Sequence, residues 1–142
     1  MAHPVRVLIA DDSARAREGL RALLATWPDI VVVGEAANGR MAVRLVAASR
    51  PDVVLMDLRM PVLDGVQATR LIKQQWPATT VVVLTMYSLE QNAALAAGAD
   101  AFVIKRGAPD QLLSALGLGA TSAGIVSDGP ASLDLETFPN VE

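Results

Sequence analysis

The chain has 142 residues, of which 52% are hydrophobic, 19% charged and 4% aromatic, and its net charge is −3. This length suits one domain with a compact core. The absence of cysteine excludes a disulfide framework, a thiolate metal site and a cysteine nucleophile. No apolar run approaches the roughly 20 residues that span a bilayer, and the start of the chain lacks the pattern of a signal peptide. We therefore expect a cytoplasmic protein with no membrane partner.

The charges are unevenly distributed along the chain. All 12 Lys and Arg residues precede residue 117, whereas four of the 15 acidic residues follow it. Neither part carries the basic stripe that is typical of nucleic-acid binding, so we expect no direct contact between this chain and nucleic acid. Residues 117–142 are also rich in Gly and Ser. We predict one folded domain over residues 1–116, followed by a Gly-rich acidic linker or tail over 117–142.

Five short apolar runs alternate with segments of helical periodicity. The runs are continuous rather than alternating in polarity, which is typical of parallel strands that are buried on both faces. Repeated βα units are joined by right-handed crossovers and build a doubly wound sheet. The sequence therefore predicts an α/β domain with five parallel strands and five helices, the strands being Val5–Ala10, Ile30–Gly34, Val53–Met56, Thr80–Leu84 and Ala101–Ile104.

The helix boundaries have recognisable signals. Ser13 and Asp64 have side chains suited to cap the N-termini of the helices that follow them. Arg15, Arg17 and Arg21 fall on the first helical segment, where such charges usually form a solvated face. We expect these arginines to be solvated.

Polar side chains follow four of the predicted strands. Asp11 and Asp12 follow the first strand, Asp57 the third, Thr85 the fourth and Lys105 the fifth. In a doubly wound sheet, the chemistry lies at the carboxyl ends of the strands. An isolated acid at a strand end often only caps the next helix, but the complete set predicts a shared site.

This set of side chains is suited to phosphoryl chemistry. Clustered carboxylates raise one another's pKa unless a cation neutralises them. Oxygen donors without His or Cys favour Mg²⁺ or Mn²⁺ over zinc. We predict a site in which Asp57 is the nucleophile. The metal ion and Lys105 would stabilise charge on the oxygens of the transferring group.

Four segments resemble the receiver domain of two-component response regulators, and within that family the NarL/FixJ type. They are VLIADDS, PDVVLMDLRMPVLDG, VVVLT and AGADAFVIK, and the resemblance covers residues 4–116. It implies a flavodoxin-like fold with strand order 2-1-3-4-5. It also implies a bacterial signalling domain whose only reactions are self-catalysed phosphotransfer and slow self-dephosphorylation, not an enzyme with a substrate of its own.

The resemblance implies partners and site residues. The phosphoryl donor would be a sensor histidine kinase, a phosphotransfer protein or a small phosphodonor. Asp57 would be the phosphoacceptor, and Asp11, Asp12 and the backbone carbonyl of Arg59 would complete the Mg²⁺ (or Mn²⁺) site with it. Lys105 would pair with the phosphoryl group.

The resemblance also implies a conformational switch. Thr85 would bond to a phosphoryl oxygen after transfer, and the aromatic ring of Phe102 would then rotate into the vacated space. The surface formed by the fourth helix, fifth strand and fifth helix would change and could serve a homodimer or another partner. Arg59 and Tyr87 stand at the positions that govern the lifetime of the phosphoryl group.

Three other functions compete with this interpretation. The chain could be the receiver part of a NarL-type transcription factor that ends in its linker. Residues 117–142 are too few and too acidic to form the DNA-binding domain themselves. A haloacid-dehalogenase-like phosphatase needs an acid two residues after its nucleophile, where this chain has Arg59. A phosphorylation-independent scaffold is disfavoured by the complete set of acidic, hydroxyl and Lys positions.

Overall fold

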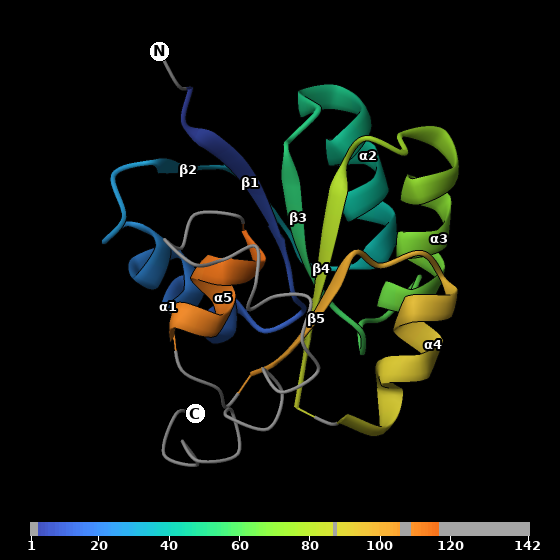
Figure 1. The fold of residues 1–142 in the computed structure, drawn as a ribbon. Coiled ribbons are helices and arrows are strands. Elements are labelled where there is room, and N and C mark those ends of the chain that lie inside the picture. Colours follow the sequence, from blue (N-terminus) through green and yellow to red (C-terminus); the bar gives the residue numbers. More distant parts are fainter. Residues whose placement is uncertain (1–2, 87, 106–108, 117–142) are drawn as a thin grey trace.

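The computed structural model describes residues 3–86, 88–105 and 109–116 of the chain. It contains one sheet of five parallel strands in the order β2-β1-β3-β4-β5 (Figure 1). Both the predicted fold class and the strand order are confirmed. The predicted tail, 117–142, lies outside the described residues. Within the described ranges, none of the helices combines the length and apolar character needed to cross a bilayer.

Strands and helices alternate along the chain. In order they are β1 (Val5–Ala10), α1 (Ala14–Leu24), β2 (Ile30–Ala36), α2 (Gly39–Ser49), β3 (Val53–Asp57), α3 (Gly65–Gln75), β4 (Thr80–Thr85), a short 3₁₀ helix η1 (Ser88–Glu90), α4 (Gln91–Ala96), β5 (Ala101–Ile104) and α5 (Pro109–Ala115). Three strands, β2, β3 and β4, run further than predicted, because the residues that follow their apolar runs continue the ladder. Asp57 pairs with Leu84, and Thr85 pairs with Ile104.

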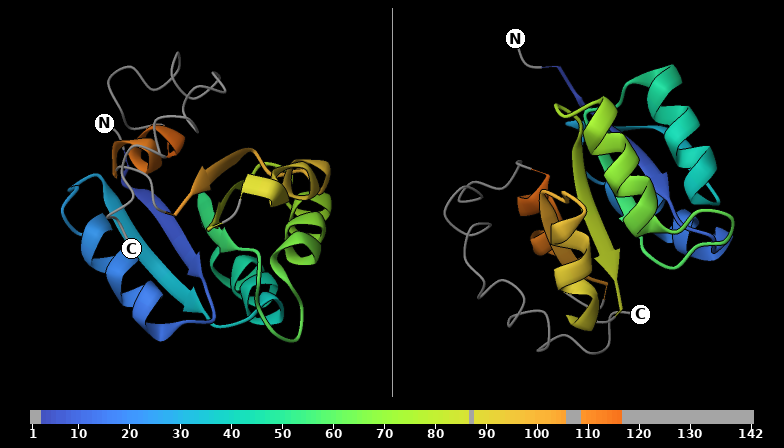
Figure 2. Two further views of the ribbon diagram at one scale, coloured as in Figure 1. Left: turned by 90° about the horizontal axis from the view of Figure 1, so that it is seen from below. Right: turned by 90° about the vertical axis from the view of Figure 1, so that its right-hand side faces the viewer.

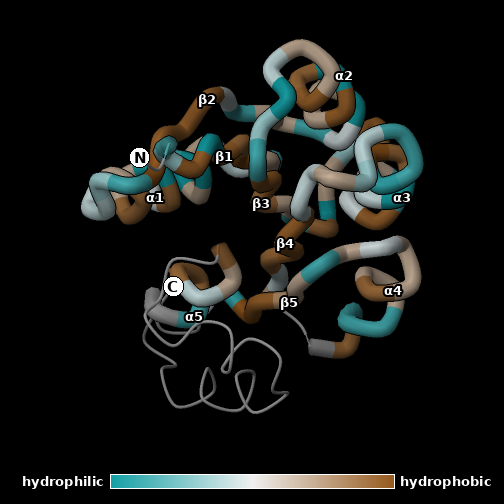
Figure 3. The backbone as a smooth tube through the Cα atoms, turned by 45° about the horizontal axis from the view of Figure 1, so that its top comes forward, coloured by the Kyte–Doolittle hydropathy of each residue, from teal (hydrophilic) through white to brown (hydrophobic). Residues whose placement is uncertain are grey.

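The helices cover the sheet in two layers. Figure 2 shows α1 and α5 on one side of the sheet and α2, α3 and α4 on the other. Successive strand residues point to opposite faces, so Val7 and Ile9 belong to the layer under α1 and α5, whereas Leu8 and Ala10 belong to the other layer. The strands are hydrophobic along most of their length (Figure 3). This double burial explains why the strands read as continuous apolar runs.

Side-chain caps fix where three of the helices begin. Ser13 accepts a hydrogen bond from the backbone N–H of Ala16, and Asp64 accepts one from Gln67, as predicted. The cap of α2 is Asn38, which the sequence analysis did not single out. Each cap satisfies a backbone donor that the first turn of a helix leaves unpaired.

The loop from β3 to α3 folds back tightly on its neighbours. The Gly65 N–H donates to the Leu58 carbonyl at 2.8 Å, and the Gly39 N–H donates to the Leu63 carbonyl at 2.9 Å. A Cβ at Gly65 would collide with the backbone carbonyl of Asp57, and one at Gly39 would collide with that of Leu63. Glycine at these two positions therefore allows the close approach that sets the course of the chain after Asp57.

The same loop contains an unusual turn. Val62 has φ of 71°, and the Leu63 N–H donates to the Pro61 carbonyl at 2.7 Å. A bond between residues two apart around a residue of positive φ is a γ-turn of the rarer kind. A β-branched residue adopts this conformation only at an energetic cost, so the contacts on either side must hold the loop in place.

The close approach at Gly65 predicts the outcome of a pair of substitutions. We expect Gly65→Ala to lower the free energy of unfolding by about 2 kcal/mol, because the new Cβ meets backbone that cannot easily yield. Gly19→Ala is the matched control, since Gly19 lies in α1 with nothing within 4 Å of a Cβ. It should raise stability by about 0.5–1 kcal/mol. Urea unfolding of both variants checks this, and equal effects would contradict it.

A second prediction concerns Thr69, which is fully buried on α3. Among the described residues, its Oγ1 has no hydrogen-bond partner. A buried hydroxyl without a partner costs about 1–3 kcal/mol, so Thr69→Val should raise the free energy of unfolding by about 1 kcal/mol. The control is Thr26→Val, which removes an exposed hydroxyl that donates to the Leu23 carbonyl and should not stabilise. Destabilisation by Thr69→Val in urea unfolding would refute the prediction.

Candidate functional site

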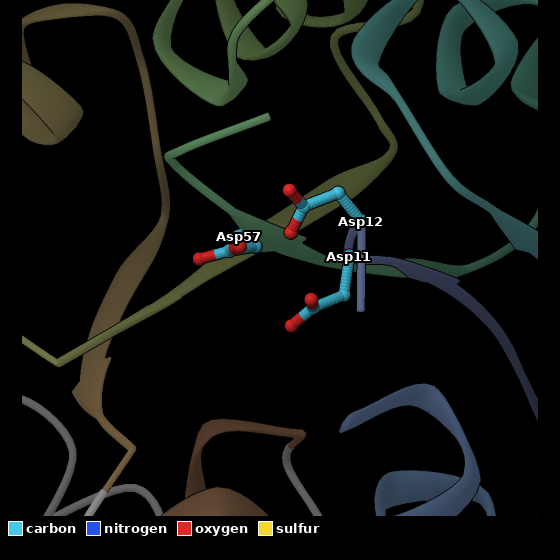
Figure 4. A group of neighbouring side chains, drawn as sticks. All are labelled: Asp11, Asp12 and Asp57. Atoms are coloured by element: carbon cyan, nitrogen blue, oxygen red, sulfur yellow. The ribbon is translucent and has the colours of Figure 1, made fainter. Parts of the chain in front are cut away.

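Three carboxylates meet at the carboxyl edge of the sheet. Asp11 and Asp12 follow β1, and Asp57 is the last residue of β3. One oxygen atom from each of the three lies within 4.8 Å of the others. Figure 4 shows all three side chains turned to the same side of the strand ends. Adjacent central strands thus bring together residues that are far apart in the sequence, as the sequence predicted.

Lys105 joins this group from the end of β5. Its Nζ donates to Oδ2 of Asp11 at 2.7 Å and lies 3.5 Å from Oδ1 of Asp57. Asp11 is 1% exposed, and its Oδ1 accepts from the Ser13 N–H at 2.9 Å. The ammonium group therefore partly compensates the negative charge that the carboxylates concentrate there.

The carboxyl group of Asp57 is electrostatically perturbed. Its pKa is raised from 3.8 to about 6: burial is the largest cause, Lys105 opposes the rise, and the charges of Asp11 and Asp12 add to it. The pKa of Lys105 is raised above its usual value: burial would lower it, but the bonds and charges of Asp11 and Asp57 outweigh that effect. In the metal-free protein, Lys105 therefore compensates the charge of Asp57 incompletely.

The arrangement fits a hard divalent cation. The clustered donors are carboxylate oxygens only, which suits Mg²⁺ or Mn²⁺ rather than zinc. Asp12 is exposed, and the side chain of Asp57 is 12% exposed. Asp11 already bonds through both oxygens, but each has a further lone pair. Asp12 and Asp57 thus offer direct ligands, and Asp11 closes the buried side of the site.

The segment Asp11–Asp12, between β1 and α1, is held in place by side chains of α1 and β2. Nη1 of Arg17 donates to the backbone carbonyl of Asp11 at 2.6 Å, and Nε of the same residue donates to Glu35 Oε1 at 3.1 Å. The Arg21 Nε donates to Glu35 Oε2 at 2.6 Å. The hydrogen bond from Arg21 is the main cause that lowers the pKa of Glu35, and Arg17 lowers it further, against burial.

For Arg17, the expectation of a solvated position is wrong. Its side chain is 18% exposed and is anchored on both Asp11 and Glu35. The helical spacing of the arginines places them on one helix, but it does not show that β2 supplies an acid opposite them. That acid, Glu35, lies in the strand extension that the sequence analysis left out.

Thr85 is buried at the end of β4, with 2% exposure, next to the site. Its backbone carbonyl accepts from the Lys105 N–H at 2.7 Å. Its hydroxyl donates to Oε1 of Glu90 at 2.6 Å, and Oε2 of Glu90 accepts from Arg59 Nε at 2.9 Å. Burial would raise the pKa of Glu90, but the bonds from Thr85 and Arg59 outweigh this and lower it.

Glu90 is a residue that the sequence analysis missed. It stands five residues after Thr85, in a region where an acid is unremarkable at the start of a helix. No spacing rule links it to Arg59, which follows a different strand. The contact between Glu90 and Arg59 forms because the sheet places β3 beside β4, so the segments that follow these strands are neighbours.

The remaining predicted residues are placed as follows. Phe102, in β5, is partly buried and packs against both apolar layers of the core. Arg59 lies in the loop after β3, and its side chain reaches across to Glu90. Tyr87, the second predicted lifetime residue, lies outside the described residues.

Comparison with known proteins gives a consistent picture. A family model described as "Response regulator receiver domain" matches residues 7–117. The chain is 47% identical over 111 residues to the uncharacterized transcriptional regulatory protein YhcZ of Bacillus subtilis, covering 77% of this chain and 52% of that protein. It is 33% identical over 127 residues to the nitrate/nitrite response regulator NarL of Escherichia coli, covering 88% and 59%. The chain therefore spans little more than half the length of these relatives.

Solved structures agree with the sequence relatives. A LuxR-family two-component response regulator from Aurantimonas sp. superposes with a TM-score of 0.79 at 34% identity, covering 96% of each chain. The receiver domain of a putative NarL from Mycobacterium tuberculosis gives a TM-score of 0.76 at 32% identity, covering 81% of this chain and 94% of that one. On this evidence, the chain belongs to the response regulator receiver domain family of bacterial two-component systems and is of the NarL/LuxR type.

Proposed function

We propose that Asp57 accepts a phosphoryl group in a Mg²⁺-dependent reaction. The observation that carries this proposal is the convergence of Asp11, Asp12 and Asp57 within 4.8 Å, with the Lys105 ammonium 3.5 Å from Asp57. The donor would be a sensor histidine kinase, a phosphotransfer protein or a small phosphodonor. All of these present a phosphoryl group whose charge the same site would stabilise. We place this reaction in the cytoplasm.

The proposed reaction is an in-line displacement. A carboxylate oxygen of Asp57 attacks the phosphorus atom, the bond from phosphorus to the donor breaks, and the donor leaves with the bonding electron pair. A Mg²⁺ ion held by Asp11, Asp12, Asp57 and the Arg59 carbonyl would supply charge stabilisation on the phosphoryl oxygens. Lys105 would move its hydrogen bond from the carboxylates to the phosphoryl group and stabilise the same charge.

The output of the reaction would be a change of surface. Thr85 would donate to a phosphoryl oxygen, and the ring of Phe102 would rotate into the space that Thr85 vacates. Since Phe102 packs against both apolar layers, this movement would reach α4 and α5. We propose that the face formed by α4, β5 and α5 then binds a protein partner, with a second copy of this chain as one candidate, and that Arg59 and Tyr87 set the lifetime of the phosphoryl group.

A second candidate function follows from the relatives. YhcZ is named as a transcriptional regulatory protein, and the matched relatives are nearly twice as long as the matched region. The domain at 1–116 would then control a DNA-binding part that residues 117–142 connect to it, without touching DNA itself. A phosphatase of the haloacid-dehalogenase type is disfavoured, because the position of its acid holds Arg59, whose side chain is paired with Glu90.

Phosphorylation itself is testable by intact mass. After incubation with Mg²⁺ and acetyl phosphate, we expect a single phosphoryl adduct on the wild-type protein, because the carboxylate of Asp57 would act as the nucleophile. Asp57→Asn removes the nucleophile and should abolish the adduct, as should EDTA. If no adduct forms and beryllofluoride with Mg²⁺ also fails to bind, the proposed function is wrong.

The raised pKa of Asp57 predicts a pH dependence of stability in the metal-free protein. Its native pKa, about 6, lies above its unfolded value, so the native state holds an extra proton between about pH 4 and 6. Stability is therefore lost as the pH rises through this window, and the cost is fully present above it. From pH 5 to 7.5 in EDTA, we expect the wild type to lose about 1 kcal/mol relative to Asp57→Asn.

Urea unfolding at the two pH values measures this difference directly. At pH 7.5, adding Mg²⁺ should stabilise the wild type more than the Asn variant, since a ligand that binds only the native state raises its stability. Parallel pH profiles of the two proteins would contradict the assignment of the raised pKa to Asp57.

A further inference from the structure

Glu90 connects the two loops that flank Asp57. It is the last residue of η1, which follows β4, and its side chain is 22% exposed. One carboxylate oxygen accepts from the buried hydroxyl of Thr85, and the other accepts from Arg59, in the loop after β3. The orientation of the carboxylate is therefore fixed from both sides, with one oxygen held against Thr85.

The hydrogen bond from Thr85 has a simple consequence. A threonine hydroxyl has one hydrogen to donate. At 2.6 Å from Glu90 Oε1, that hydrogen is committed to a charged acceptor, and hydrogen bonds to charged groups are the stronger ones. A phosphoryl oxygen on Asp57 can receive the same hydrogen only after the bond to Glu90 breaks.

We propose that Glu90 is a positioning residue that competes with the phosphoryl group on Asp57 for the hydroxyl of Thr85. This inference rests on the proposed function of Asp57 and deepens it. Glu90 holds Thr85 in the unphosphorylated position and so makes the activated state less favourable. Two ligands that require the same donor exclude each other, so loss of Glu90 favours any state in which Thr85 bonds to a phosphoryl group or its mimic.

Arg59 makes the exchange practicable. When the hydroxyl leaves, Glu90 keeps its ion pair with Arg59, whose side chain is 68% exposed. The carboxylate is therefore not left as an uncompensated charge, which would be costly at a partly buried position. The same ion pair ties the loop after β3 to η1 before and after the exchange.

The test measures the affinity for beryllofluoride, a phosphoryl mimic, in the presence of Mg²⁺. Isothermal titration of the full chain compares the wild type with Glu90→Ala, Thr85→Ala and the double variant. Glu90→Ala should bind beryllofluoride about three- to tenfold more tightly, as expected for removal of one competing charged hydrogen bond. In the Thr85→Ala background, the Glu90 substitution should change the affinity by less than about twofold.

Two further variants sharpen the comparison. Glu90→Gln keeps the size and one acceptor oxygen but loses the charge, and should give a smaller gain in the same direction. It also serves as the test if Glu90→Ala does not fold. Glu18→Ala removes an exposed acid of α1 and should leave the affinity unchanged, which separates competition for Thr85 from a general effect of net charge.

The outcomes separate this inference from the proposed function. Wild-type binding with no gain in either Glu90 variant overturns the role of Glu90 and leaves the proposed function standing. An equal gain with and without the Thr85 hydroxyl also overturns it, because the effect would then not pass through Thr85. Failure of the wild type to bind beryllofluoride overturns the proposed function and this inference with it.

Discussion

The contact between Lys105 and Asp11 is the interaction on which the rest of the site depends. The two residues are 94 positions apart, and their side chains meet at 2.7 Å. Lys105 brings positive charge to a place where three carboxylates would otherwise repel one another. The contact exists because all five strands are parallel, so Asp11, which follows β1, and Lys105, which follows β5, lie at the same edge of the sheet.

The fold supplies the surroundings that this cluster needs. Arg17 and Glu35 fix the Asp11–Asp12 segment from α1 and β2. Gly65 lets the start of α3 lie closely against the backbone of Asp57. These contacts hold the three carboxylates close together, although their charges repel one another. Burial, together with the charges of Asp11 and Asp12, raises the pKa of Asp57, and Lys105 offsets this only in part. The metal-free site therefore retains unfavourable charge that a cation would relieve. A carboxylate cluster that is held in place and only partly neutralised is suited to binding a cation.

Much of this could be predicted from the sequence. Continuous apolar runs identify parallel strands, and the residues that follow them must meet at one edge, so Asp11, Asp57 and Lys105 could be grouped without coordinates. Ser13 and Asp64 follow from local capping chemistry. The contacts of Arg17 and the role of Glu90 could not be foreseen, because they depend on partners that follow or belong to other strands, namely Glu35 for Arg17 and Arg59 for Glu90. Helical periodicity predicts which residues share a face of a helix, but it does not predict which residue of another element a long side chain will contact.

The place of β5 in the sheet bears on where movement is easiest. β5 ends the sheet and pairs with β4 on one side. An edge strand has backbone groups that no neighbouring strand restrains, so it can shift without breaking a second ladder. Phe102 stands on this strand and touches both apolar layers. The central strands thus keep the acidic cluster in a fixed geometry, and under the proposed function the edge strand β5 is where phosphorylation of Asp57 would change the surface of the molecule.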